Sequence, residues 1–372
     1  MKKIMIHINS LGKGGAERVV SLLAGCFQKD KIQVIIATLW RAQEEYPLAE
    51  GVKRIHVGLT REEENAPSIK QQWIRLKKLR RALKEEKPDV LISFCAKANY
   101  RALMAAWQTG YPVVVSVRND PKIDYVGPKK QLLNKLLLNK AAGCVFQTEE
   151  ARDFFDQKLQ KKGIIICNPV NERFLQAERR PAEKKIVCVG RLVRQKNQLF
   201  LVKAFEGVLQ AYPDYHLYLY GDGSNDECKE ELLQYVKQGR AGDIPLTERI
   251  HFMGLSSCLE RDMADAAMFV LPSRYEGMPN ALMEAMALGL PVISTDCPCG
   301  GSRYWITPGK TGQLVAVGDV KGLQRAMEEY IQNPGQAETM GREAEKRLQE
   351  AALPRVYEQW KNYLNRVMIG RN

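Results

Sequence analysis

Short apolar runs alternate with helical stretches along the first half of the chain. The runs lie at 3–8, 33–38, 89–94, 113–117, 144–147 and 164–167, and they are rich in β-branched residues. Runs of this length between helical segments are typical of buried strands in an open parallel sheet. Residues 1–170 are therefore expected to form one doubly wound α/β domain.

The same alternation starts afresh after a charged link at 176–183. The second set of apolar runs lies at 185–190, 216–220, 250–253, 268–271 and 292–294. A chain of 372 residues also exceeds the usual range of a single hydrophobic core. We therefore predict the α/β class, with two doubly wound, Rossmann-like domains that face each other across a cleft.

Two carboxylates flank the predicted start of a helix in the segment 274–291. Glu276 lies in the loop before this helix, Glu284 lies inside it, Pro279 suits its first turn, and Gly289 ends it. The free amides of the first turn and the helix dipole favour a phosphate, while carboxylates can accept hydrogen bonds from sugar hydroxyls. This pattern indicates a nucleotide-sugar site. The alternative is an amphipathic surface helix with two solvated glutamates.

A basic loop follows the first predicted strand of the second half. Arg191 and Lys196 lie at the carboxyl end of that strand, which is where ligands bind in open parallel sheets. Both cations are in place to hold a diphosphate. The alternative is a solvated basic loop without a ligand.

A glycine-rich loop follows the first strand of the chain and opens a helix. Gly14 and Gly15 would let the backbone approach a ligand closely. The loop fails the dinucleotide-binding pattern, because Glu17 stands where the third glycine belongs and no acidic residue ends the second strand. A nicotinamide enzyme is therefore disfavoured.

Metal chemistry has no support in the sequence. There is no Asp-x-Asp motif, and the four histidines lack the spacing of metal ligands. The charge on a departing diphosphate would instead be neutralised by Arg191, Lys196 and the amides of a helix start. The nine cysteines form no disulfide framework, so we expect reduced thiols.

The net charge of +13 is unevenly distributed. Residues 1–170 hold 30 Lys+Arg against 17 Asp+Glu, whereas residues 171–372 hold 26 of each. Much of the excess lies at 70–84, which has the pattern of a basic amphipathic helix. That helix is either a solvated face packed on a core or a surface for an anionic membrane, and no motif for nucleic acid accompanies it.

Membrane spans and signal peptides are not predicted. No run of about 18 apolar residues occurs, and the apolar start of the chain is too short for a signal peptide. We therefore expect a cytoplasmic protein, and the basic helix would let it bind peripherally to the inner face of the membrane.

Taken together, these motifs resemble those of retaining glycosyltransferases of family four, which have the two-domain GT-B architecture. The resemblance spans nearly the whole chain. It rests on the segments 14–18, 168–170, 189–192, 196–197, 220–223, 276–284 and 308–315.

The resemblance implies a role for each candidate residue. Arg191 and Lys196 would bind the donor diphosphate, Glu284 the nucleotide ribose and Glu276 the hydroxyls of the transferred sugar. Sugar and phosphate would lie against Gly277, Met278, Pro279, Asn280 and Ala281, with Pro279 offering only its carbonyl. Gly14 and Gly15 would approach the diphosphate from the other domain. The acceptor-side domain would comprise 1–170 and a C-terminal helix of about 354–372, and the donor-binding domain 171–353.

The chain departs from the family pattern at one position. Many relatives have a histidine after the fourth strand of the first domain, where this sequence has Arg118 and Asn119. The departure is compatible with a mechanism in which a donor phosphate oxygen takes the acceptor proton while Arg118 or Asn119 orients the sugar. A similar segment occurs in members that build surface polysaccharides and glycans on polyprenyl diphosphate.

The sequence therefore predicts a retaining, metal-independent transferase that needs no cofactor besides its nucleotide-sugar co-substrate. It would move a hexose or N-acetylhexosamine from a UDP-sugar to a lipid-linked or surface-polysaccharide acceptor. Its predicted partners are the donor, a polyprenyl-diphosphate-linked glycan and an anionic membrane surface, without nucleic acid. The alternatives are an enzyme acting on a soluble acceptor, a nucleotide-sugar epimerase and a non-catalytic nucleotide-sugar-binding subunit.

Overall fold

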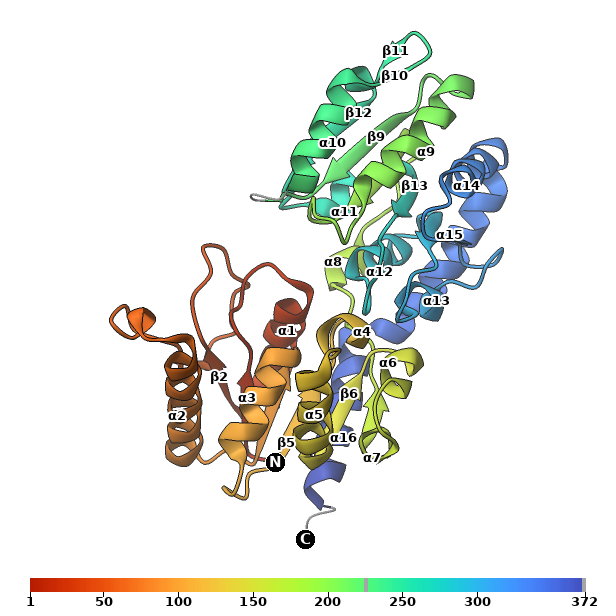
Figure 1. The fold of residues 1–372 in the computed structure, drawn as a ribbon. Coiled ribbons are helices and arrows are strands. Elements are labelled where there is room, and N and C mark those ends of the chain that lie inside the picture. Colours follow the sequence, from red (N-terminus) through yellow and green to blue (C-terminus); the bar gives the residue numbers. More distant parts are fainter. Residues whose placement is uncertain (224–226, 370–372) are drawn as a thin grey trace. The chain divides into compact units, whose positions relative to one another are not determined.

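The computed structural model describes residues 1–223 and 227–369, and the chain divides into two compact units (Figure 1). Unit 1 comprises Met1–Pro169 and Leu353–Asn372, and unit 2 comprises Val170–Ala352. The division after Pro169 lies next to the boundary expected after residue 170. The last three residues of the helix expected at about 354–372 lie outside the described residues.

Unit 1 is built on a parallel sheet of seven strands in the order β3-β2-β1-β4-β5-β6-β7. The strands are β1 (Lys3–His7), β2 (Gln33–Thr38), β3 (Lys53–His56), β4 (Val90–Phe94), β5 (Val113–Ser116), β6 (Gly143–Phe146) and β7 (Gly163–Ile165). Only β3 was not predicted. It is an edge strand whose residues are half-buried or exposed, so it shows no apolar run.

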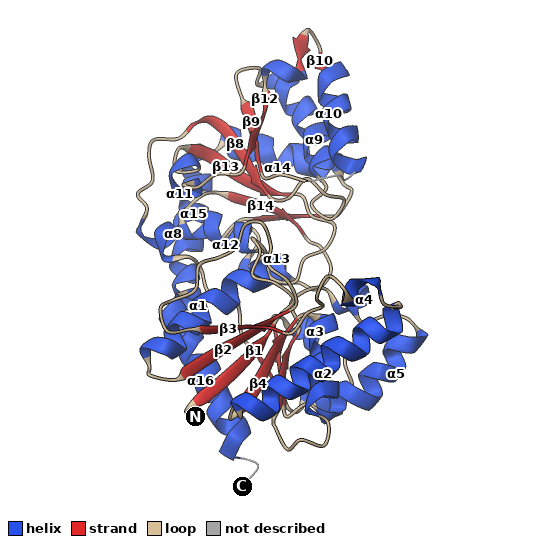
Figure 2. Cartoon of the chain, turned by 90° about the vertical axis from the view of Figure 1, so that its left-hand side faces the viewer, coloured by secondary structure: helices blue, strands red, loops and turns tan. Residues whose placement is uncertain are grey.

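Helices cover both faces of this sheet. They are α1 (Gly15–Lys29), α2 (Ser68–Glu86), α3 (Ala96–Ala106), α4 (Pro121–Asp124), α5 (Pro128–Leu137), α6 (Glu149–Asp153), α7 (Gln157–Gln160) and α16 (Leu353–Ile369). In Figure 2, α2, α3 and α5 lie on one side of the strands, and α1 and α16 lie on the other. The apolar faces of both layers bury the core of unit 1 against the sheet.

The C-terminal helix α16 completes the core of unit 1. Its Trp360 is fully buried and stacks on Phe94, with ring centroids 5.6 Å apart. The hydroxyl of Tyr363 accepts the backbone N–H of Cys144 at 2.7 Å and donates to the carbonyl of Lys162. These contacts join the last helix to the strands around β6, far away in the sequence.

Unit 2 contains a second parallel sheet, of six strands in the order β12-β9-β8-β13-β14-β15. The strands are β8 (Glu183–Val189), β9 (His216–Tyr220), β12 (Ile250–Gly254), β13 (Ala266–Leu271), β14 (Val292–Thr295) and β15 (Gln313–Val315), and a small antiparallel pair is formed by β10 (Arg240–Ala241) and β11 (Ile244–Pro245). The strand β15 and the small pair were not predicted, because each is too short to show an apolar pattern.

The helices of unit 2 alternate with its strands. They are α8 (Glu172–Gln176), α9 (Gln198–Ala211), α10 (Glu227–Gln238), α11 (Leu259–Asp262), α12 (Asn280–Ala287), α13 (Gly301–Trp305), α14 (Val320–Gln332) and α15 (Pro334–Leu348). Both units are thus parallel α/β domains, which confirms the predicted fold class.

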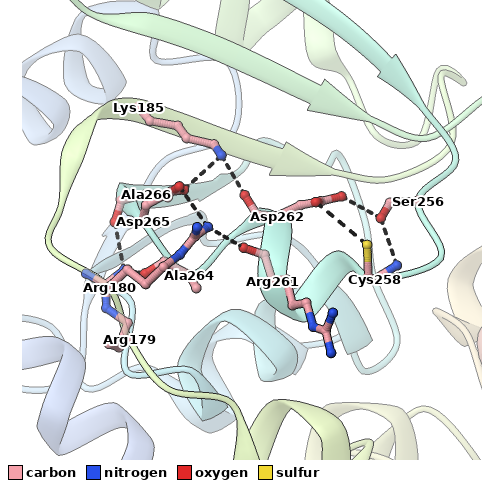
Figure 3. A network of polar contacts seen from close by, with 10 residues as sticks. All are labelled: Arg179, Arg180, Lys185, Ser256, Cys258, Arg261, Asp262, Ala264, Asp265 and Ala266. Atoms are coloured by element: carbon pink, nitrogen blue, oxygen red, sulfur yellow. Dashed lines mark hydrogen bonds and ion pairs between the residues drawn. The ribbon is translucent and has the colours of Figure 1, made fainter.

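The charged link before β8 is fixed at the amino edge of the second sheet (Figure 3). Arg179 donates to the carbonyls of Ala264 at 2.8 Å and Ala266 at 3.0 Å. Asp265 pairs with both Arg180 at 2.8 Å and Lys185 at 2.9 Å. The network holds the strands β8 and β13 together at the end opposite to the predicted ligand loops.

Each sheet has one point at which the strand order reverses. In unit 1 this point lies between β1 and β4, and in unit 2 it lies between β8 and β13. Open parallel sheets bind their ligands beyond the carboxyl ends of the two strands at such a point. The loops that follow these four strands are therefore the places to look for a site.

Candidate functional site

In unit 2, the loops that follow β8 and β13 meet through an ion pair that is partly buried. Lys196 Nζ lies 2.5 Å from Glu276 Oε1, and Ser273 Oγ donates to the same oxygen at 2.7 Å. The side chains of Lys196 and Glu276 are 17% and 7% exposed. The structure thus brings together two of the predicted site residues and adds Ser273, whose only sequence signal was its place directly before the glutamate segment.

Backbone and amide contacts join the same two loops. The N–H of Arg274 donates to the carbonyl of Gln195 at 2.8 Å, and Gln195 Nε2 donates to the carbonyl of Tyr275 at 3.0 Å. Asn197 adopts a left-handed backbone conformation, with φ of +54°, directly before α9. These hydrogen bonds therefore hold the two loops against each other at the carboxyl edge of the sheet.

The loop that follows β9 packs closely against the loop that follows β8, and glycines permit this contact. A Cβ atom at Gly221 would lie 2.2 Å from the carbonyl oxygen of Gly190, and one at Gly223 would lie 2.4 Å from that of Leu192. Only glycine permits such close approach of two backbones. The motif at 220–223 therefore supports the basic loop, in which the side chain of Arg191 is exposed and has no ion-pair partner among the described residues.

Helix α12 begins at Asn280, one residue later than the sequence indicated. Pro279 was expected in the first helical turn but is the N-cap, because its backbone is extended, with φ of −77° and ψ of 101°. No side chain of this N-cap accepts from the first-turn amides. The helix start thus keeps the property that favours an anionic group.

The loop before α12 is held rigidly. Gly277, Met278 and Pro279 are buried, and Trp305 Nε1 donates to Met278 Sδ at 2.9 Å. A Cβ atom at Gly301 would lie 2.1 Å from the carbonyl oxygen of Gly277, so α13 packs directly on this loop. The backbone of Gly301 and the side chain of Trp305 therefore fix the loop that is predicted to surround the donor.

Both glutamates of the segment are buried. Glu276 and Glu284 each expose 5% of their surface. The alternative of two solvated glutamates on a surface helix is therefore wrong. Burying a carboxylate is costly unless it has a partner, and Lys196 is the partner of Glu276.

The glycine-rich loop of unit 1 leads directly into α1. Gly14 is the N-cap with an extended backbone, and Gly15 is the first helical residue. The N–H of Gly14 donates to the carbonyl of Gly12 at 2.7 Å, and Gly12 also forms a bridge with Glu45. The predicted glycines thus lie at a helix start beyond the carboxyl end of β1.

Arg118 follows β5 and packs between two aromatic rings. Its guanidinium carbon lies 4.7 Å from the ring centroid of Phe94 and 5.4 Å from that of Trp360, and Nη1 donates to Asn168 Oδ1 at 2.9 Å. Its Nε and Nη2 are buried and have no hydrogen-bond partner among the described residues. Burial lowers the pKa of Arg118 to about 10. Arg118 therefore ties the motif at 168–170 to α16.

Asn119 lies beside Arg118 but has different surroundings. Its Nδ2 is 3.5 Å from Asp124 Oδ1, in α4, which makes a weak hydrogen bond. Burial is the main cause that raises the pKa of Asp124. Of the two residues predicted to orient the sugar, Asn119 has the looser contacts, so it is freer to turn toward a ligand.

Some of the basic side chains of α2 form contacts within unit 1. Lys78 pairs with Glu63 at 2.5 Å, and Arg80 donates to the carbonyls of Ala105 at 3.0 Å and Trp107 at 2.9 Å. The cations at 70, 77 and 84 are exposed instead. Lys77 lies over the ring of Trp73, with its Nζ 3.5 Å from the ring centroid. Part of the predicted membrane face is therefore structural, and the lysines at 70, 77 and 84 remain exposed to solvent.

The described residues contain neither a cluster of metal ligands nor a membrane-spanning helix. Within 1–223 and 227–369, no three His, Cys, Asp or Glu side chains gather as they would around a metal ion. Every helix in these ranges is too short or too polar to cross a bilayer.

Comparison with known proteins identifies relatives for both halves of the chain. Residues 13–174 match the family described as Glycosyltransferase Family 4, and residues 183–333 match the family described as Glycosyl transferases group 1. An uncharacterised glycosyltransferase of Methanocaldococcus jannaschii is 27% identical over 254 residues, which cover 61% of this chain and 60% of that protein.

Two other relatives match over nearly their whole length. A Campylobacter jejuni α-1,4-N-acetyl-D-galactosaminyltransferase, named for a GalNAc-GalNAc-diNAcBac-PP-undecaprenol acceptor, is 23% identical and covers 97% of each chain. The crystal structure of HepE from Anabaena in complex with UDP has a TM-score of 0.79 and 18% identity, and covers 98% of this chain and all of that one. This likeness shows that the chain has the GT-B fold. Since glycosyltransferase families match both of its halves, the chain belongs to the family-four glycosyltransferases.

Proposed function

We propose that this protein is a retaining glycosyltransferase that moves a hexose or N-acetylhexosamine from a UDP-sugar to a glycan on polyprenyl diphosphate or to another surface-polysaccharide acceptor. The observation that carries the proposal is the partly buried ion pair of Lys196 and Glu276 at the strand-order reversal of unit 2. A cation and a carboxylate placed together there suit a ligand that carries both a diphosphate and a polyol.

The donor would be bound by charge and by backbone amides. Arg191 and Lys196 would neutralise the diphosphate, and the uncapped start of α12 would add its amides and dipole. Glu284 would accept hydrogen bonds from the ribose. Fixed donors of this kind also stabilise the charge that develops on the departing UDP, so the proposal requires no metal ion.

Retention would follow from attack on the face that the diphosphate leaves. The bond between the anomeric carbon and the diphosphate oxygen breaks, and the acceptor hydroxyl oxygen forms its bond on the same face. The acceptor proton passes to an oxygen of the departing diphosphate, so no side chain has to act as a general base. Glu276 would hold hydroxyls of the transferred sugar, and Asn119 or Arg118 would orient that sugar.

The net positive charge of residues 1–170 and the name of a similar protein both support the proposed acceptor class. The excess of cations in residues 1–170 suits a diphosphate-linked acceptor at an anionic membrane. The Campylobacter relative is named for an acceptor of this class. We accordingly propose that the protein works peripherally on the cytoplasmic face of the membrane.

Calorimetric titration with UDP, GDP and ADP, with and without EDTA, tests the donor assignment. We expect selective binding of UDP that the chelator does not change. Lys196→Ala should weaken this binding about ten-fold or more, since it removes a charge-assisted contact. Arg194→Ala is the matched control, because Arg194 is an exposed cation of the same loop. Absence of nucleotide binding in the wild type would contradict the donor assignment, and transfer to soluble sugars alone would favour the soluble-acceptor enzyme.

A further inference from the structure

Unit 1 contains a buried arginine, Arg101, that pairs with no carboxylate among the described residues. Arg101, in the second turn of α3, is only 7% exposed. Its Nη1 donates to His7 Nε2 at 3.0 Å and to Asn9 Oδ1 at 3.3 Å, so the guanidinium lies at the carboxyl end of β1. Both of these partners are neutral acceptors, and neither compensates the positive charge of Arg101.

The neutrality of His7 follows from its own contacts. His7 Nδ1 lies 2.8 Å from the carbonyl oxygen of Ala37, which can only accept, so Nδ1 carries the hydrogen and Nε2 accepts from Arg101. Burial, and then the cation of Arg101, lower the pKa of His7 to about 3. His7 thus orients Arg101 without adding or removing charge.

A second arginine faces the same point from α2. Arg75 lies four positions before Leu79 and eight before Leu83, and both leucines are buried. Residues at this spacing share one face of a helix, so Arg75 points inward. Its Nε is buried and has no hydrogen-bond partner among the described residues.

The packing of α2 on α3 sets the two arginines at the same level. Arg80 of α2 donates to the carbonyl of Ala105, which fixes the relative height of the two helices. Arg75 lies about one turn before Arg80, and Arg101 lies about one turn before Ala105. Figure 2 shows α2 and α3 on the same side of the sheet. Consistent with this proximity, burial and then the cation of Arg75 lower the pKa of Arg101 to about 10.

Arg75 and Arg101 lie where open parallel sheets bind their ligands. His7 ends β1, and Arg101 belongs to the helix that follows β4, so the pair lies at the strand-order reversal of unit 1. The pair of Lys196 and Glu276 occupies the corresponding point of unit 2. The N-terminal halves of α2 and α3, whose dipoles favour anions, point to the same edge of the sheet.

We propose that Arg75 and Arg101 form an anion-binding site in unit 1 that takes a phosphate group of the acceptor, such as the diphosphate of a polyprenyl-linked glycan. Two neighbouring guanidinium groups that pair with no carboxylate in the described part of the chain repel each other. A phosphate would relieve this repulsion through charge-assisted hydrogen bonds. The acceptor as the source of the phosphate rests on the proposed function. The anion site itself does not.

Thermal unfolding of the full chain with inorganic pyrophosphate tests the anion site, with UDP in saturating amounts to fill the donor site. We expect pyrophosphate to raise the Tm of the wild type and to have at most half of this effect on Arg75→Met. Without ligand, Arg75→Met should be as stable as the wild type or more stable, because the repulsion is removed. Equal pyrophosphate shifts in the two proteins would overturn the site.

Two further variants serve as controls for the pyrophosphate experiment. Arg81→Met removes an exposed cation of α2 that pairs with Glu85, and it should respond to pyrophosphate as the wild type does. Loss of the response in this control as well would reduce the effect to overall charge and overturn the proposal. Arg101→Lys keeps the buried positive charge but lacks the planar guanidinium group. If it folds, it should show half of the rise in Tm that pyrophosphate causes in the wild type.

Steady-state kinetics distinguish the acceptor from free phosphate as the ligand. In Arg75→Met we expect the KM for a diphosphate-linked acceptor to rise about ten-fold, with an unchanged KM for the UDP-sugar. An unchanged acceptor KM together with a lost pyrophosphate response would refute the acceptor assignment and leave free phosphate as the ligand. A wild type without any transfer would contradict the proposed function, whereas the unfolding measurement would still decide the anion site.

Discussion

The ammonium of Lys196 and the carboxylate of Glu276 lie 2.5 Å apart although 80 residues separate them in the chain. Each residue follows a strand at the point where the strand order of unit 2 reverses. The ion pair is therefore a product of the topology, since only neighbouring parallel strands bring these two loops to one edge of the sheet.

Breaking this pair should cost both stability and activity. Lys196→Ala leaves Glu276 buried without its counter-ion, and we expect the free energy of unfolding to fall by about 3 kcal/mol. Turnover should fall on the order of 100-fold, because a fixed donor to the developing charge is lost. Urea unfolding and steady-state transfer measure the two effects.

The double variant Lys196→Ala, Glu276→Gln is the control for this prediction. It removes both charges, so it should recover part of the lost stability while its activity stays low. If the losses of the two single variants, Lys196→Ala and Glu276→Gln, simply add up in the double variant, the two residues are not coupled as described.

His7 should make the stability of the protein fall in mild acid. Its pKa is about 3 in the folded protein, against an ordinary histidine value of 6.5, so below pH 6.5 the unfolded chain binds a proton that the folded chain does not. Stability is therefore lost as the pH falls, by about 2 kcal/mol between pH 7 and pH 5. Urea unfolding at the two pH values should show this loss in the wild type.

The variant His7→Gln isolates this contribution. The remaining titratable groups are the same in both proteins, so their effects cancel in the comparison. The pH-dependent loss should be smaller in the variant by about 2 kcal/mol. Identical losses in both proteins would show that His7 is not the group responsible.

The exposed lysines of α2 should determine binding to anionic vesicles. Replacing Lys70, Lys77 and Lys84 with glutamine should lower the partition coefficient on the order of 100-fold, since each basic residue near such a surface contributes about 1 kcal/mol. Arg80 is left intact because it donates to carbonyls at the end of α3. Co-sedimentation with vesicles at low salt measures the effect.

A matched triple variant in unit 2 has the same change in net charge. Lys237, Lys310 and Lys321 are exposed, and their replacement with glutamine should leave vesicle binding close to that of the wild type. Equal losses in both triple variants would mean that overall charge, and not the face of α2, attracts the membrane.

Tyr363 should be needed to hold α16 on unit 1. Tyr363→Phe leaves the buried N–H of Cys144 without its acceptor and the carbonyl of Lys162 without its donor, which should cost about 1–3 kcal/mol. Tyr111→Phe is the control, because the hydroxyl of Tyr111 has no hydrogen bond among the described residues. Equal stability of the two variants in urea would contradict the prediction.

The sequence predicted the strands well where they are buried on both faces. A buried strand needs a continuous apolar run, and β2 and β9 begin and end at the expected residues. The edge strand β3 and the three-residue β15 were missed, because half-buried or very short strands carry no such run. The start of α12 was placed one residue too early, since a proline suits the N-cap as well as the first turn.

The sequence by itself determined which loops carry cations and carboxylates, because these loops directly follow recognisable strands. Only the tertiary structure decided what each charge does. Arg80 contacts carbonyls of α3, Arg118 lies between Phe94 and Trp360, and Arg101 is bound by two neutral acceptors. The physical reason is that a charge acts through its nearest partners, and the order of the strands chooses those partners from distant parts of the chain.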